Sequence, residues 1–330
     1  MRSRLSIFSS RVLGSALVWT VLAAALVEAW AGRALPARFY NHEVDQLLDL
    51  LDRGSGPDAD MVFLGDSVGR QVSRALALAE PDFFLPLASN GGIETAGQYF
   101  VLRRYLARHP APKRIVLMML NPVEGLLDGK YTENYFQRGF LHGDEIAAVA
   151  PLRRSLPFTL TMVGYRLSPV FRCRIGLQAV VPWLETPSPW SGQFAAAEIV
   201  GQPPEIPKHG LLDLGGKWLK RFRRGPQISA VFFDRLAALM EARGIEWLFL
   251  PPPLPASSAG GGPTGVFGRQ LAQVVARQDR YPALRVHAAF QIYPDDWFAD
   301  EIHLKAERLP AVARDYAEIL RAEDFGPSAP

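Results

Sequence analysis

Short apolar runs, each followed by a turn and then by a helical pattern, most constrain the fold of this chain. The runs at 61–64, 115–120 and 247–250 contain no polar residue. A strand that is apolar on both faces is typical of a parallel sheet covered by helices on both sides. We therefore expect an α/β fold in which strands and helices alternate.

The same alternation extends over most of the chain after the N-terminal segment. We expect strands at 61–64, 82–88, 113–120, 245–250 and 284–290, and helices at 42–54, 68–79, 94–110, 230–244 and 309–323. The stretch from about 129 to 227 breaks the pattern, because it is rich in aromatic residues and proline. We interpret it as a long insertion with helices of its own, since a structureless loop of that length is rare.

The N-terminus combines positive charge with an uncharged apolar run. Arg2, Arg4 and Arg11 precede a segment from Val12 to Val27 that carries no charge, and Glu28 ends it. This run is near the lower limit of the roughly 17–25 residues that cross a bilayer. The arginines favour an N-terminus inside the cell and the main body outside. We predict a cytoplasmic tip and transmembrane signal anchor over 1–35 and one catalytic domain over 36–330.

Two alternatives to an anchor stay open. The residues "AWAG" at 29–32 resemble a signal-peptide cleavage site, so the segment can instead be removed after export. A buried soluble helix is the third reading, which the arginine-rich flank disfavours. Either membrane reading predicts a single-pass protein of the inner membrane, or one released from it, with the catalytic domain in the periplasm.

Composition excludes several classes of protein. The net charge of +3 does not argue for nucleic acid, and no zinc-finger or RNA-binding motif is present. Cys173 is the only cysteine, so no intrachain disulfide can form. The glycine-rich stretch 257–265 lacks the lysine of a phosphate-binding loop. Histidines show no metal-ligand spacing, and we predict no metal and no cofactor.

Three polar turns directly follow predicted strands. They are Gly65-Asp66-Ser67, Ser89-Asn90-Gly91-Gly92 and Asn121-Pro122. The carboxyl ends of parallel strands meet at one edge of the sheet, where ligands bind. We therefore expect the three turns to lie together.

A second polar pair stands just before the last helix. Asp300 and His303 are three residues apart, a spacing that brings a carboxylate to the imidazole Nδ1 across a turn. The Nε2 atom is then free to take a proton from a hydroxyl. Ser67, at the predicted start of a helix, supplies a hydroxyl that such a base activates.

These motifs together resemble the SGNH (GDSL-like) hydrolase superfamily. The resemblance rests on "FLGDS" after the first strand, the Gly/Asn turn after the second, Asn after the third and "DEIH" before the last helix. It implies a three-layer α/β/α sandwich with a parallel flavodoxin-like sheet. It also implies that Ser67 is the nucleophile, His303 the base and Asp300 its orienting acid. The oxyanion donors would be Ser67 N–H, Gly91 or Gly92, and the Asn121 side chain.

This chain departs from the superfamily at the third block, which reads "MLNP" where Gly-x-Asn-Asp is usual. With an N-terminal anchor, the chain more specifically resembles periplasmic proteins of polysaccharide O-acetylation and teichoic-acid D-alanylation. That resemblance implies an O-acyltransferase for a polysaccharide, working beside a membrane-bound O-acyltransferase. An esterase for carbohydrate or lipid, and a catalytically silent glycan-binding or scaffold subunit, are the alternatives.

Overall fold

A computed structural model describes residues 3–34, 47, 51, 58–79, 84–89, 93–123, 140–170, 228–259, 265–300 and 302–325. The central element is a five-stranded parallel sheet with the order β2-β1-β3-β4-β6. Its strands are β1 (Met61–Gly65), β2 (Leu85–Pro86), β3 (Arg114–Met118), β4 (Glu246–Phe249) and β6 (Leu284–Val286). All five lie within the expected strand segments, apart from one residue at the end of β1, so the predicted parallel α/β sheet is confirmed.

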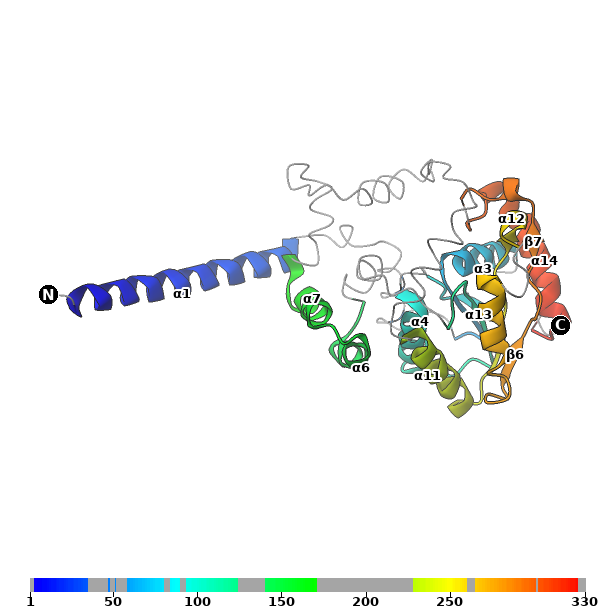
Figure 1. Ribbon diagram of the computed structural model, residues 1–330, viewed down its shortest axis with the longest axis horizontal. Helices are drawn as coiled ribbons and strands as arrows, with labels where there is room; N and C mark the ends of the chain where they lie inside the picture. Colours follow the sequence, from blue (N-terminus) through cyan, green and yellow to red (C-terminus); the bar gives the residue numbers. More distant parts are fainter. Residues whose placement is uncertain are drawn as a thin grey trace.

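Alternate residues of each strand enter two separate hydrophobic clusters. Val62 and Leu64 of β1 pack in a cluster with α4 (Glu94–Leu106) and α11 (Ile228–Ala242). Phe63, between them, packs in the other cluster with α3 (Ser67–Ala79) and α14 (Leu309–Ala322). Helices therefore lie on both faces of the sheet, which explains why the strands are apolar throughout. This arrangement is compatible with an α/β sandwich (Figure 1).

Helices occupy most of the expected positions. The prediction is confirmed for α3, α4, α11 and α14, with α3 at Ser67–Ala79 and α14 at Leu309–Ala322. Most of the predicted helix at 42–54 lies outside the described residues. A further helix and a small two-stranded sheet were not predicted: α13 (Val266–Val275), and β5 (Leu254–Pro255) paired with β7 (Ile292–Tyr293). The remaining short helices are α12 (Ala256–Ala259), η6 (Asp295–Trp297) and η7 (Ala306–Arg308).

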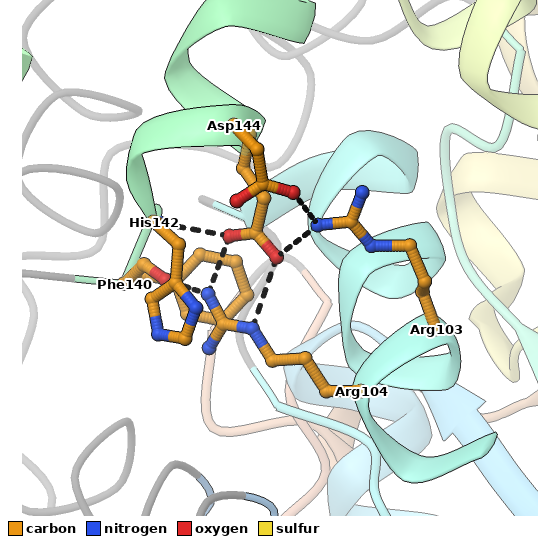
Figure 2. A network of polar contacts seen from close by, with 6 residues as sticks. Arg103, Arg104, Phe140, His142 and Asp144 are labelled. Atoms are coloured by element: carbon orange, nitrogen blue, oxygen red, sulfur yellow. Dashed lines mark hydrogen bonds and ion pairs between the residues drawn. The ribbon is translucent and has the colours of Figure 1, made fainter. Parts of the chain in front are cut away.

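The expected insertion contains α6 (Gly143–Arg153) and α7 (Leu156–Leu167). Figure 2 shows how polar contacts hold the start of α6 on α4. The fully buried Glu145 accepts a hydrogen bond from Arg104 Nε at 3.0 Å and one from His142 N–H at 2.9 Å. Arg103 bridges Glu145 at 2.9 Å and Asp144 at 2.6 Å. Because a buried carboxylate is stable only when it is paired, this network fixes where α6 lies. Residues 129–139 and 171–227 of the insertion lie outside the described part.

The N-terminal segment forms α1 (Ser3–Ala34), which extends away from the sheet in Figure 1. Glu28 of α1 accepts a hydrogen bond from Val170 N–H at 3.0 Å and another from the Ser168 hydroxyl. These bonds join α1 to the end of α7. In the described part of the chain, no helix is both long and apolar enough to cross a membrane. The helix is confirmed, but the expected transmembrane anchor is not supported, and Glu28 interrupts its apolar run.

Candidate active site

Ser67 is the first residue of α3 and follows β1 after a tight turn. The turn is narrow because α3 begins directly over the end of β3. A Cβ atom on Gly65 would lie 2.3 Å from the Met118 carbonyl oxygen, and one on Gly69 would lie 2.6 Å from it. Glycine is therefore required at both positions by close backbone approach. This packing presents Ser67 at the carboxyl edge of the sheet, as expected.

His303 and Asp300 reach Ser67 from the other end of the chain. The Nε2 atom of His303 lies 2.8 Å from Ser67 Oγ, and its Nδ1 atom lies 2.7 Å from Asp300 Oδ2. These contacts confirm the predicted geometry of the three side chains. The ring is about one-third exposed and the Asp300 side chain about one-fifth. The site is thus reachable from solvent while its acid is mostly shielded.

Asp300 is held by its own turn. Its Oδ1 atom accepts hydrogen bonds from Ile302 N–H at 2.9 Å and His303 N–H at 2.7 Å. Burial alone would raise the pKa of Asp300, but the hydrogen bond to the imidazole, the His303 charge and the two backbone N–H groups together hold that pKa below its ordinary value. The ionised Asp300 accepts a hydrogen bond from Nδ1–H, so Nε2 faces the hydroxyl as an acceptor.

Backbone hydrogen bonds within this segment hold the turn that carries Asp300 and His303. Ala299 N–H donates to His303 O at 2.8 Å, and Lys305 N–H donates to Trp297 O at 2.8 Å. The side-chain amide of Gln71 in α3 forms two hydrogen bonds with the backbone of Leu304, the residue after His303. Gln71 Nε2 donates to Leu304 O at 3.2 Å, and Leu304 N–H donates to Gln71 Oε1 at 3.1 Å. Gln71 therefore fixes the His303 turn to the helix that begins with Ser67.

Unlike its neighbour Ser67, Asp66 uses its side chain to bind backbone N–H groups. Its Oδ1 atom accepts from Val68 N–H at 3.0 Å and Gly69 N–H at 3.2 Å, and its Oδ2 atom accepts from Leu120 N–H at 2.8 Å. Burial raises the pKa of Asp66 above its ordinary value, and these three backbone N–H groups act in the opposite direction. Asp66 thus joins the β1 turn to the segment that follows β3, and these contacts stabilise the turn.

The oxyanion candidates are only partly described. Ser67 N–H makes no hydrogen bond to any residue that the structure describes, whereas the next N–H groups of α3 bind Asp66. The Oδ1 atom of Asn121 is buried and has no described hydrogen-bond partner. Asn121 follows Leu120, which is bound to Asp66, so it lies at the same edge as Ser67.

Gly91 and Gly92 lie outside the described residues, but their flanks are held at this edge. Ser89 N–H donates to Gly65 O at 2.9 Å before them. After them, the Thr95 hydroxyl donates to Pro122 O at 2.5 Å. Ser89 therefore lies beside the end of β1, and Thr95 lies beside Pro122, the residue that follows Asn121.

Gln98 is a second positioning residue that the sequence reading missed. It is fully buried in α4 and makes both hydrogen bonds to Gly65: Gly65 N–H donates to Oε1 at 3.2 Å, and Nε2 donates to Gly65 O at 2.8 Å. One signal was available, because Gln98 shares helical spacing with Val101, Leu102 and Tyr105, which are buried. A polar residue in a buried stripe needs a buried partner.

The five-stranded sheet places these groups at the point where its strand order reverses. β2 lies on one side of β1, and β3, β4 and β6 lie on the other. Such a reversal opens a crevice beyond the carboxyl ends of the strands. Among the described residues, no group of three His, Cys, Asp or Glu side chains is placed to hold a metal ion. The arrangement can deliver a serine nucleophile with a general base.

In comparisons with known proteins, no family model, curated protein or solved structure matches this chain.

Proposed function

We propose that this protein is a serine-dependent acyl-transfer enzyme of the SGNH type, with Ser67 as nucleophile, His303 as base and Asp300 as its orienting acid. The observation that carries the proposal is the unbroken chain of hydrogen bonds from Asp300 through His303 to Ser67. The strand order, which matches a flavodoxin-like sheet in its reversal, supports the same assignment.

The chemistry follows from the tautomer that Asp300 selects. As Ser67 Oγ attacks an ester carbonyl carbon, His303 Nε2 takes the hydroxyl proton, and the carbonyl oxygen becomes an oxyanion. His303 then gives that proton to the departing alcohol, leaving the acyl group esterified to Ser67. An acceptor hydroxyl, deprotonated by His303, attacks this ester, and the proton returns to Ser67. Ser67 N–H and Asn121 are the donors that we assign to the oxyanion.

Apolar residues adjoin this hydroxyl–imidazole pair in the chain. Val68 follows Ser67 and Ile302 precedes His303, and both belong to a cluster with Leu120, Leu254 and Phe290. An apolar wall suits an acyl group and limits water near the acyl-enzyme. It supports transfer to a sugar hydroxyl, with a polysaccharide as acceptor and an esterase as the alternative. A membrane-bound O-acyltransferase would supply the acyl group. We also propose an extracytoplasmic location, which a reporter fused after Pro330 would test by being active only outside the cytoplasm.

A fluorophosphonate probe tests the central assignment directly. The wild-type protein should be labelled on Ser67, and Ser67→Ala should not be labelled, as read by mass spectrometry. Ser73→Ala is the matched control, because Ser73 lies in the same helix but is fully buried, and labelling should continue. Absence of labelling and of acetyl-ester cleavage in the folded wild type would instead indicate a silent glycan-binding subunit.

Cleavage of p-nitrophenyl acetate with and without oligosaccharide acceptors then separates the two reactions. A transferase attaches the acetyl group to the oligosaccharide, which gains its mass. An esterase releases acetate whether the acceptor is present or not.

A further inference from the structure

A groove is lined by residues of α3 and α14, the two helices that pack together on one face of the sheet. Figure 1 shows where these helices lie in the fold. The volume of the groove is about 620 Å³. The space exists because small residues line both helices. They are Ala75 and Ala79 on α3, and Ala313 and Ala317 on α14. Because these residues are four apart, each pair lies on one side of its helix. Small side chains there leave space that larger ones would fill.

The lining of the groove has an unusual composition. Nine of its fourteen residues are alanine, leucine or proline, four are arginine and one is glutamine. The floor includes Leu76 and Ala313, which are each only 3% exposed. The arginines are Arg70, Arg74, Arg314 and Arg321, and among the described residues they are the only charged ones that line it.

We propose that this groove binds an anionic amphiphile, with an acyl chain on the apolar floor and a phosphate or carboxylate head on the arginines. Guanidinium groups pair with the oxygens of such heads in two parallel hydrogen bonds. From Arg70 to Ala79 the groove extends over ten residues of α3, a rise of roughly 14 Å. That length accepts an extended alkyl chain beside the head group.

The lining does not suit a sugar chain. Its described residues include no aromatic ring on which a sugar face can stack, and Gln71 is the only neutral side chain among them that forms hydrogen bonds. Free phosphate would leave the apolar floor uncovered. The charge and the floor together are complementary to a molecule that carries both features.

The groove also touches the catalytic turn. Gln71 lines it and holds Leu304, the residue after His303, through both of its amide atoms. A ligand seated against Gln71 therefore lies next to the segment that positions the base. The binding proposal is independent of what Ser67 does, since it requires no turnover.

Calorimetry with the full chain tests the proposal with four probes. Dodecyl phosphate, below the concentration at which it forms micelles, should bind saturably at one site. Dodecyl maltoside, inorganic phosphate and an oligogalacturonate should each bind at least about tenfold more weakly. Tighter binding of the oligogalacturonate would overturn the proposal in favour of an anionic glycan. Equal binding of the maltoside would overturn the role of the arginines.

Variants locate the site. Arg74→Ala with Arg314→Ala removes two exposed groove charges and should weaken dodecyl phosphate binding by about tenfold or more. Arg235→Ala with Arg243→Ala removes the same charge from exposed positions in and after α11 and should leave it unchanged. Ala317→Leu fills the groove and should also weaken binding, with a thermal melt to verify the fold. Full binding by the Arg74/Arg314 variant would refute the site.

Discussion

The imidazole Nε2 of His303 lies 2.8 Å from the hydroxyl oxygen of Ser67, although 236 positions separate the two residues in the chain. Ser67 begins α3 two residues after the end of β1, and His303 stands on a turn just before η7 and α14. The packing of α3 against α14 and the Gln71–Leu304 pair bring them together. The base is therefore positioned by the helix that carries the nucleophile.

Ser67 and His303 act as a unit, because His303 takes the proton of the Ser67 hydroxyl. The effects of substituting them on activity should therefore not be additive. Ser67→Ala and His303→Ala should each reduce ester cleavage by at least roughly 10³-fold, and the double variant should lose little more. Steady-state rates on p-nitrophenyl acetate measure all three. A double variant whose loss equals the product of the single losses would show that the residues act separately.

Asp300→Asn changes both activity and the dependence of stability on pH. The amide cannot orient the imidazole in the same tautomer, so activity should fall by roughly 10³-fold or more while the fold survives. Since the pKa of Asp300 is lowered by folding, its ionised form stabilises the protein above the unfolded value near 3.9. That contribution is lost as the pH falls through the lower folded pKa.

Urea unfolding of the wild type and of Asp300→Asn checks this sign. The stability difference between them should be constant from about pH 6 to 5 and should shrink as the pH falls below about 4. A difference that grows on acidification would mean that Asp300 is protonated in the folded protein.

Gly65→Ala should destabilise the protein by at least about 2 kcal/mol, because the added Cβ meets a backbone oxygen that cannot move without shifting β3. The predicted contact is 2.3 Å from Met118 O. Gly143→Ala is the control, since no atom lies within 4 Å of its Cβ, and it should change stability by less than about 1 kcal/mol. Thermal and urea unfolding compare the two, and equal effects would contradict the close packing of α3 on β3.

Gln71→Ala separates positioning of the base from folding. It should reduce kcat by about tenfold, through a looser His303 turn, and leave KM almost unchanged. Gln278→Ala is the matched control, because Gln278 also donates to a backbone carbonyl, that of Leu284, at the opposite edge of the sheet. If both variants keep full activity, the Leu304 contact does not position the base.

The sequence by itself determined the main architecture and the identity of the three candidate catalytic residues. Fully apolar strands such as 115–120 require cover on both faces, and a parallel sheet with helices on both sides supplies it. Ser67 was predictable because a strand ended in Gly-Asp-Ser, and Asp300 because the Asp-x-x-His spacing closes locally into its own turn. These features depend on neighbours in the chain, so pattern reveals them.

Only the tertiary structure decided which distant groups hold the site in place. Gln98 binds the backbone of Gly65, and Gln71 binds the backbone of Leu304. Every residue type has these backbone groups, so the sequence does not show which residue each glutamine binds. The groove between α3 and α14 likewise depends on which helix faces meet. The membrane anchor is a prediction from local sequence that the structure does not support. It rested on the hydropathy of residues 12–27, and no described helix is long and apolar enough to cross a membrane. Local rules fix turns and strands, whereas contacts between remote segments depend on the packing of the whole chain.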